Sequence, residues 1–200
     1  TAGNDTAKLA EVYDAWADEY DESVSAVGYT NPAVVSALFA RLMPDIEAPV
    51  LDAGCGTGLI GWMLTLVGYR DIVGIDLSPG MLKRAAARGC YRSLATATLG
   101  QPLALPDAAF AGVVASGVFT VGHAPASAFR EIARVLRPGG IFVVSITDPV
   151  YESGGFREAI DELVGEGAWE RAATSGSYLP LPAADDDHRH PGKVYAMRRR

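Results

Sequence analysis

Short apolar runs and amphipathic segments alternate along the middle of this chain. The apolar runs predict buried strands over 50–53, 71–76, 92–97, 111–116 and 140–147. The segments after them carry apolar residues at helical spacing and predict helices over 58–67, 79–88, 126–136 and 155–165. Strands that alternate with helices in this way favour a parallel sheet with helices on both faces.

The two ends of the chain depart from this alternation. Residues 6–21 predict an amphipathic helix with an aromatic stripe, and a second helix is predicted to begin after Asn31 and run to about Met43. Residues 168–178 and 193–199 are predicted to pair as terminal antiparallel strands. The expected fold class is therefore α/β: a Rossmann-like, doubly wound, mostly parallel seven-stranded sheet with helices on both faces and an antiparallel C-terminal strand pair.

The stretch from Val50 to Gly61, VLDAGCGTGLIG, is the most informative motif. It consists of a buried strand that ends in an acid, a glycine-rich turn and the start of a helix. Glycines let the backbone turn tightly and approach a ligand closely. A second acid, Asp76, closes the next apolar strand, where a carboxylate suits the diol of a ribose. Together these features predict a nucleoside-containing cofactor at the carboxyl ends of two parallel strands.

Two kinds of cofactor fit this pattern. Residues 56–61 satisfy the G-x-G-x-x-G spacing of a dinucleotide site, with Asp76 about 20 residues further on. However, Asp52 would repel the pyrophosphate that a dinucleotide places at such a turn. S-adenosylmethionine carries a cationic sulfonium and a cationic amino group, so an acid at Asp52 favours it, unless that acid is only a helix cap. The sequence also lacks a Tyr-x-x-x-Lys pair for reductase chemistry.

Four motifs resemble those of the class I S-adenosylmethionine-dependent methyltransferases with a type 11 domain. LDAGCGTG, GIDLSPGML, LPDAAFAGVV and VLRPGG occur in the order of that family, across about residues 10–147. The segments ASGVFTVGH, ITDPVYESGGF and YLPLP also resemble a narrower group, similar to the Williams–Beuren region methyltransferase. The resemblance implies S-adenosyl-L-methionine as the cofactor and methyl transfer as the reaction.

The resemblance also assigns residues to the cofactor. Asp76 is expected to bind the ribose, because Ser78 before Pro79 is the better N-cap for the next helix. The family often has an acid after the third strand that binds the adenine amino group, and here that position falls on Thr98, whose hydroxyl can accept one hydrogen bond. The cofactor-binding residues expected are Tyr20, Asp52, Gly54, Cys55, Gly56, Gly58, Asp76, Leu77, Met81, Thr98, Leu99, Ser116, Gly117 and Val118.

The acceptor side of the site rests on fewer signals. His123, outside the polar connector that holds the other histidines, is either a general base for the acceptor proton or a loop histidine in a structural hydrogen bond. In similar enzymes an N-terminal helix covers the cofactor, so residues 1–45 are expected to form a helical lid on a methyltransferase domain of residues 46–200. The side chains expected to line the substrate pocket are Tyr29, Phe119, Tyr151 and Phe156.

Composition limits the kinds of partner and compartment that are expected for this protein. A net charge of -7 argues against a nucleic-acid groove, and the arginines at 198–200 are typical of a solvated terminus. Cys55 and Cys90 show no pairing pattern and indicate free thiols in a reducing compartment. No signal peptide or membrane-spanning run is visible, so a cytoplasmic protein without a membrane partner is expected. The stretch 185–190 is expected to be a solvated loop, and no metal site is expected.

The expected function is methyl transfer from S-adenosylmethionine to a small-molecule acceptor. Such a transfer needs alignment of the nucleophile and exclusion of water more than it needs a catalytic residue. The sequence leaves open the acceptor and the oligomeric state. Two alternatives remain: a protein that binds S-adenosylmethionine or S-adenosylhomocysteine with little catalysis, because the adenine acid is missing, and an NAD(P)-binding Rossmann oxidoreductase.

Overall fold

A computed structural model gives the positions of residues 6–120 and 122–200. The strands are β1 (Val50–Ala53), β2 (Ile72–Asp76), β3 (Ser93–Thr96), β4 (Phe110–Ala115), β5 (Leu136–Thr147), β6 (Trp169–Thr174) and β7 (Gly192–Arg199). The helices are α1 (Thr6–Trp16), α2 (Tyr20–Ala26), α3 (Asn31–Leu42), α4 (Leu59–Val67), α5 (Pro79–Ala87), α6 (Ala128–Val135), α7 (Asp148–Ser153) and α8 (Phe156–Gly165). Each predicted strand is present.

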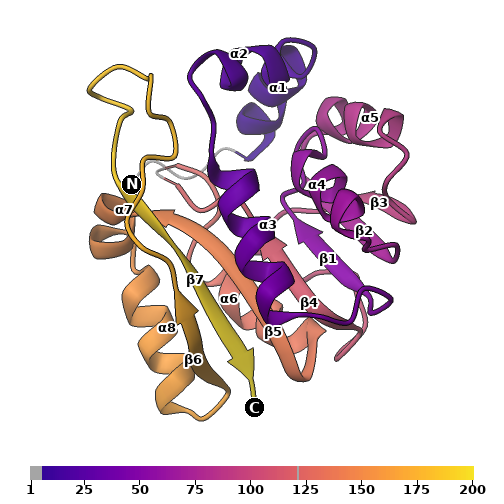
Figure 1. Ribbon diagram of the computed structural model, residues 1–200, viewed down its shortest axis with the longest axis vertical. Coiled ribbons are helices and arrows are strands. Elements are labelled where there is room, and N and C mark those ends of the chain that lie inside the picture. Colours follow the sequence, from indigo (N-terminus) through magenta and orange to yellow (C-terminus); the bar gives the residue numbers. More distant parts are fainter. Residues whose placement is uncertain (1–5, 121) are drawn as a thin grey trace.

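The strands form one seven-stranded sheet in the order β3-β2-β1-β4-β5-β7-β6 (Figure 1). β1 pairs in parallel with β2 and β4, and β7 pairs antiparallel with β5 and β6. All four residues of β1 are buried, as a strand covered on both faces requires. The predicted fold class is therefore confirmed, including the antiparallel C-terminal pair.

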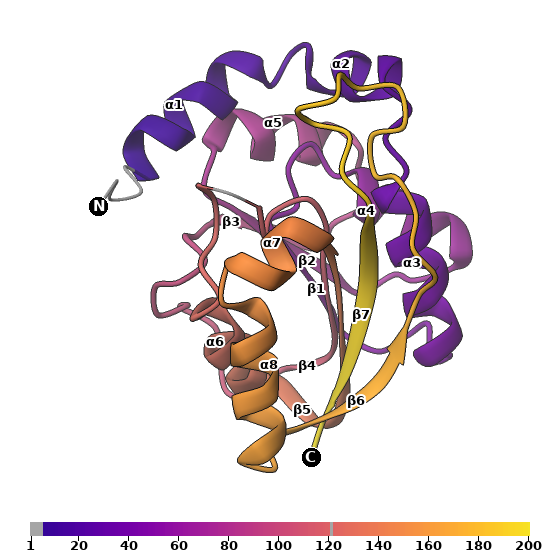
Figure 2. The same cartoon turned by 90° about the vertical axis from the view of Figure 1, so that its left-hand side faces the viewer.

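Helices cover both faces of the sheet. Figure 2 shows α6 and α8 on one side of the strands and α3 and α4 on the other. On the first side, Phe129 of α6 packs between Phe142 of β5 and Trp169 of β6. On the second side, Phe39 of α3 packs against Tyr69 with ring centroids 5.4 Å apart. The two faces thus hold separate apolar cores.

The order of the strands determines where a ligand can bind. The chain leaves β1 toward α4 on one face and leaves β4 toward α6 on the opposite face. Because the two connections diverge, a crevice opens at the carboxyl ends of β1 and β4, which is the usual ligand site of doubly wound sheets. The glycine-rich turn and the segment after β4 both lie at this edge.

The single helix predicted over 6–21 is wrong, because the structure divides it into α1 and α2. The turn between them brings the rings of Trp16 and Tyr20 to a centroid separation of 4.7 Å. The indole of Trp16 also donates to the Ser23 hydroxyl over 3.1 Å. No glycine or proline marks this break, so the local sequence gives no stop signal and tertiary contacts decide it.

Two further elements differ from their predicted bounds. β5 begins at Leu136 instead of residue 140, because Leu136 takes an extended conformation and pairs with Phe110 of β4. The short helix α7 was not predicted, although Pro149 in its first turn is a start signal.

The N-terminal helices and the long β6–β7 connection meet above the carboxyl edge of the sheet. α1 lies along α5, and the connection reaches the α2–α3 junction (Figure 2). There the Ala183 N–H donates to the Val27 carbonyl over 3.1 Å, and the Thr30 N–H donates to the Pro180 carbonyl over 2.9 Å. By contrast, α3 packs directly on the sheet with Phe39 fully buried, so within the described residues 6–45 only α1 and α2 have the position of a lid.

Candidate active site

The glycine-rich turn after β1 is folded tightly against its neighbours. Gly54, Gly56 and Gly58 have φ angles of 79°, 53° and 88°, which side chains other than glycine rarely adopt. A Cβ placed on Gly54 would lie 2.6 Å from Cγ2 of Val118, so the turn and the segment after β4 can approach this closely only with glycine. The result is a wall of bare backbone at the crevice.

Asp76 lies at the end of β2 beside this turn. Its Oδ2 accepts a hydrogen bond from the Gly56 N–H at 2.8 Å, and its Oδ1 accepts one from the Ser78 N–H at 2.9 Å. Burial raises the pKa of the Asp76 carboxyl above its ordinary value. Ser78 is the N-cap of α5, because its hydroxyl accepts from the Met81 N–H at 3.0 Å. The prediction that Ser78 caps this helix is therefore confirmed.

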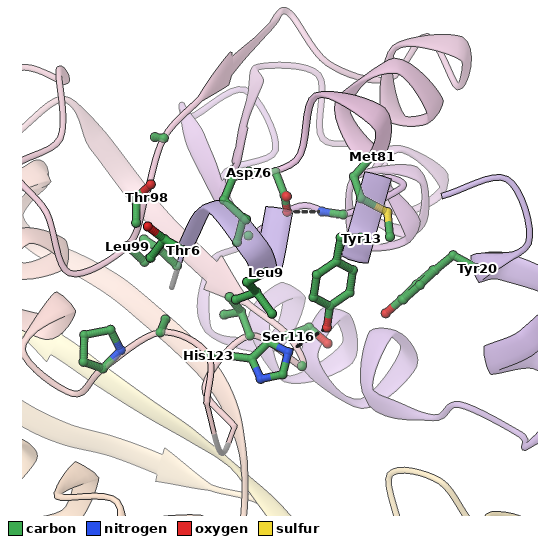
Figure 3. A pocket seen from close by; sticks show the side chains of 18 residues that line it. Thr6, Leu9, Tyr13, Tyr20, Asp76, Met81, Thr98, Leu99, Ser116 and His123 are labelled. Atoms are coloured by element: carbon green, nitrogen blue, oxygen red, sulfur yellow. Dashed lines mark hydrogen bonds between the residues drawn. The ribbon is translucent and has the colours of Figure 1, made fainter. Parts of the chain in front are cut away.

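A cavity of about 750 Å³, solvent at its mouth included, lies at this edge of the sheet (Figure 3). Most of the residues predicted for the cofactor line it: Tyr20, Gly54, Gly56, Asp76, Leu77, Met81, Thr98, Leu99, Ser116, Gly117 and Val118. His123 lines it as well, together with residues that the sequence analysis did not select: Thr6, Leu9, Tyr13, Ala97, Ala124 and Pro125. α1 contributes three of these unselected residues, which only its position over the crevice reveals.

A smaller cavity of about 300 Å³ adjoins the first one. Both cavities are lined by Tyr20, Gly54, Gly56 and Ser116, so they form one continuous site. The smaller cavity is also lined by Tyr29, Pro32, Cys55, Thr57, Leu59 and Ile60. The predicted residues Cys55 and Tyr29 thus lie on the far side of the glycine turn from Asp76.

Asp52 and Gly58 line neither cavity. The Asp52 side chain is fully buried, and its Oδ2 accepts a hydrogen bond from the Tyr91 hydroxyl at 2.7 Å. Burial, and secondarily the charge of Asp76, raises the pKa of Asp52 to about 7, although the Tyr91 hydrogen bond opposes that rise. Asp52 lies buried beneath the turn, and direct contact of these two residues with a cofactor stays a prediction.

Tyr91 reaches Asp52 through a gap that two glycines leave open. A Cβ on Gly61 would lie 2.3 Å from Cζ of Tyr91, and one on Gly74 would lie 3.0 Å from its Cε1. The sequence analysis missed Tyr91, since nothing local links it to Asp52. The glycines at 61 and 74 were the available signal, because a glycine inside an element often marks a close approach.

Three predicted substrate-pocket residues line neither cavity. Phe119 and Phe156 are buried in the core and contact each other with ring centroids 5.6 Å apart. Tyr151 stacks on Tyr195 at 4.5 Å with ring planes 7° apart. These side chains follow β4 and β5 in sequence, but they turn toward the α6–α8 face instead of the crevice.

His123 connects the loop after β4 to α1. Its Nε2 is 2.8 Å from the Tyr13 hydroxyl, and its Nδ1 is 2.7 Å from the Thr120 hydroxyl (Figure 3). Burial, followed by the charge of Asp76, raises the pKa of Tyr13 to about 12, so its phenol stays protonated. His123 therefore makes structural hydrogen bonds and also lines the cavity, and its role as a general base stays a prediction.

Acidic side chains hold α1 and α2 on α5. Asp14 accepts hydrogen bonds from the Ser78 hydroxyl and from the Gly80 N–H, the latter at 2.7 Å. The other two acid contacts lie further along α5, where Asp18 pairs with Arg84 and Asp21 pairs with Arg88. We call these contacts of Asp14, Asp18 and Asp21 the acidic latch. The spacing of these three acids was visible in the sequence, but the prediction for this segment relied on its aromatic residues instead.

A second set of hydrogen bonds reaches the site from the β6–β7 connection. The Tyr178 hydroxyl donates to Oδ1 of Asn31 at 2.6 Å, and Nδ2 of Asn31 is 3.5 Å from the Tyr29 hydroxyl. Tyr29 in turn lies 3.3 Å from the Ser116 hydroxyl at the junction of the two cavities. Asn31 and Tyr178 were also missed, because they are 147 residues apart in sequence.

Within residues 6–120 and 122–200, no group of three or more His, Cys, Asp or Glu side chains is arranged to hold a metal ion. Over the same residues, no helix is both long enough and apolar enough to span a membrane. Cys55 and Cys90 are both free thiols, as predicted.

Comparison with known proteins decides the family. The methyltransferase domain family matches residues 51–144. Methyltransferase-like protein 27 of Homo sapiens is 35% identical over 192 residues, which cover 88% of this chain and 77% of that protein. The chain belongs to the S-adenosylmethionine-dependent methyltransferases. This result confirms the predicted family and overturns the oxidoreductase alternative.

Other similar proteins support the same family. Malonyl-(acyl-carrier protein) O-methyltransferase of Serratia marcescens is 38% identical over 187 residues, which cover 90% of this methyltransferase and 67% of that enzyme. A solved S-adenosylmethionine-dependent methyltransferase from Thermotoga maritima superposes with a TM-score of 0.67 and 17% identity, covering 96% of this chain and 99% of that one. At this identity the structural likeness shows the fold alone.

Proposed function

We propose that the two adjoining cavities bind S-adenosylmethionine and that this methyltransferase transfers the methyl group to a small molecule. The observation that carries the proposal is the Asp76 carboxylate, which lines the larger cavity at the end of β2, beside the bare backbone of Gly54 and Gly56. A carboxylate in this place is suited to accept hydrogen bonds from a ribose diol. Each oxygen already accepts one backbone N–H, which fixes its direction.

The charge of the site fits this cofactor. S-adenosylmethionine carries two positive groups and one carboxylate at neutral pH, so its net charge is positive. Asp76 lines the cavity and Asp52 lies beneath the turn, while none of the described residues that line either cavity is Lys or Arg. A pyrophosphate would be repelled here, and a sulfonium would be stabilised.

The residues of the site supply alignment and exclusion of water. When bound, S-adenosylmethionine supplies a methyl carbon whose bond to sulfur breaks, with both electrons going to sulfur, as a lone pair of the acceptor bonds to that carbon. Tyr13 and Tyr20 cover the site from α1 and α2 and keep water out. Ser116 joins the two cavities at the carboxyl end of β4, where an acceptor can be aligned.

The proton released by the acceptor leaves to His123 or to solvent. His123 lines the cavity, but its Nε2 is 2.8 Å from the Tyr13 hydroxyl, so an acceptor hydroxyl must replace Tyr13 as its partner before His123 can act. A His123→Asn variant tests this role. A fall in the rate of methyl transfer with unchanged S-adenosylhomocysteine affinity is expected, and an unchanged rate would leave solvent as the proton acceptor.

A small molecule fits the covered site better than a macromolecule does. α1 lies over the cavity and contacts α5, and its residues Thr6, Leu9 and Tyr13 line the cavity. The net charge of -7 also disfavours a nucleic-acid acceptor. The residues that line this cavity decide which acceptor binds.

Calorimetry with S-adenosylhomocysteine and with NADH tests the cofactor assignment. We expect heat of binding from S-adenosylhomocysteine and none from NADH, and the reverse result would reject the assignment.

Because Thr98 replaces the acid that often binds adenine, a second candidate function is cofactor binding with little catalysis. Incubation with methyl-labelled cofactor and a metabolite extract separates the two, since only an enzyme transfers label.

A further inference from the structure

We propose that the acceptor is an uncharged, largely apolar molecule that presents an aromatic ring and one nucleophilic hydroxyl or amine, without carboxylate or phosphate groups. The proposal rests on the proposed function and names the class of substrate for the same site. Two properties of the cavity carry it, the absence of Lys and Arg among the described lining residues and the aromatic wall, together with the charge of the donor.

An anionic acceptor would find no Lys or Arg counter-charge among the described residues of this site. Among the described residues that line the two cavities there is no Lys or Arg, and the acid Asp76 is present. Arg88 lines neither cavity: its Nε donates to the Thr57 carbonyl at 2.6 Å and its guanidinium pairs with Asp21. A carboxylate or phosphate taken from water into this cavity would therefore lose hydration without gaining a Lys or Arg partner among the described lining residues.

The larger cavity has an aromatic wall, against which we place the acceptor. The rings of Tyr13 and His123 have centroids 5.7 Å apart, and those of Tyr13 and Tyr20 are 6.4 Å apart. Leu9 and Pro125 add apolar surface to the same lining. Burial raises the pKa of Tyr13 to about 12 and that of Tyr20 well above its usual value, so both phenols are neutral. Such a wall packs an aromatic ring by offset or edge contacts and offers it neutral hydroxyl groups.

The donor restricts the acceptor further. A cationic amine would be repelled by the sulfonium that it must approach, so an amine acceptor would bind in its neutral form. An anionic acceptor would have the sulfonium as its single positive neighbour, and that charge disappears when the methyl group leaves. An uncharged nucleophile avoids both costs.

Three probes that share a phenol ring and differ in charge test the proposal. They are methyl 4-hydroxybenzoate, which is neutral, 4-hydroxybenzoate, which is anionic, and tyramine, which is cationic. Their binding to the protein saturated with S-adenosylhomocysteine is measured by calorimetry, and transfer of labelled methyl is measured in parallel. We expect the neutral ester to bind at least about 10-fold tighter than the free acid. Equal binding, tighter binding of either charged probe, or no binding of any probe would overturn the proposal.

Two variants of Tyr13 locate the binding wall. Tyr13→Ala is expected to weaken binding of the ester about 10-fold, while Tyr13→Phe, which keeps the ring, stays within about 3-fold of the unaltered protein. Val12→Ala is the control, because Val12 is the neighbouring residue of α1 and its side chain is 53% exposed. Equal effects of Tyr13→Phe and Tyr13→Ala would show that the hydroxyl matters and the ring does not, against the proposal.

The S-adenosylhomocysteine titration keeps this proposal separate from the proposed function. If the unaltered protein fails to bind S-adenosylhomocysteine, the cofactor assignment fails. If it binds S-adenosylhomocysteine and prefers the anionic probe, the cofactor assignment stands and the acceptor class is wrong.

Discussion

Two acids of the cofactor motifs have different environments and different roles. Asp76 lines the cavity with both oxygens already directed by backbone N–H groups. Asp52 is fully buried beneath the turn and is hydrogen bonded to Tyr91. From the sequence alone both acids are equally plausible ligands, because each ends a predicted strand. The difference arises from Tyr91, which approaches from the far end of α5.

Replacing Asp76 with alanine should weaken binding of S-adenosylhomocysteine by about 1.5–3 kcal/mol, the range for losing a hydrogen bond to a charged group. Calorimetry measures the loss, and circular dichroism checks that the variant is folded. Asp45→Ala, at an exposed residue before β1, is the matched control and should bind normally. Unchanged affinity in Asp76→Ala would mean that this carboxylate only orders the backbone of the turn.

Asp52 should make stability depend on pH. Its pKa is 3.8 ordinarily and about 7 in the folded protein, so between these values the folded state holds a proton that the unfolded state has lost. The free energy of unfolding should therefore fall as pH rises from about 4 to 7, by up to about 1.4 kcal/mol per pH unit from this group. Urea titrations across this range should show a shallower slope for Asp52→Asn. Equal slopes would show that Asp52 is ionised throughout.

At the scale of elements, the acidic latch explains why α1 and α2 form two helices instead of one. A single straight helix over 6–21 satisfies the aromatic stripe, but the turn allows Asp14 to reach the start of α5 and Asp21 to reach its last turn. Periodicity within one segment predicts which residues share a face. It does not predict the partner that bends the segment, since that partner lies more than 60 residues away in sequence.

The two arginines of the latch should differ in importance. Arg88 is 22% exposed and its partner Asp21 is 38% exposed, whereas Arg84 and Asp18 are 45% and 90% exposed. Exposed pairs contribute little because water screens them. Arg88→Ala should therefore speed hydrogen exchange in α2 and weaken S-adenosylhomocysteine binding about 5-fold, and Arg84→Ala should do neither.

A lid that opens before the cofactor enters also predicts slower hydrogen exchange in α1 and α2 when S-adenosylhomocysteine is added.

For the whole molecule, the sheet and most of the cavity lining could be predicted, and the acceptor side could not. The strands and the glycine turn follow from apolar runs and spacing, which are local features, whereas the order of the strands comes from the structure. Phe119 and Phe156 were misplaced because sequence position indicates the edge of the sheet on which a loop begins, while packing decides which face its side chains enter. Tyr13 reaches the cavity because α1 folds back over it, which is a long-range contact.

Removing the N-terminal helices should reduce cofactor binding and methyl transfer more than it reduces the stability of the fold. Deleting residues 1–26 removes α1 and α2. Of the residues in these two helices, only Val24 is buried. The deletion leaves Phe39 and Phe129 in the two apolar cores of the sheet. S-adenosylhomocysteine affinity and methyl transfer should then fall at least about 10-fold, because the site loses Tyr13, Tyr20 and its exclusion of water. The melting temperature should change less than in Phe129→Ala, a core truncation that costs about 3–5 kcal/mol. The opposite ranking would show that α1 and α2 are part of the stable core and do not act as a lid.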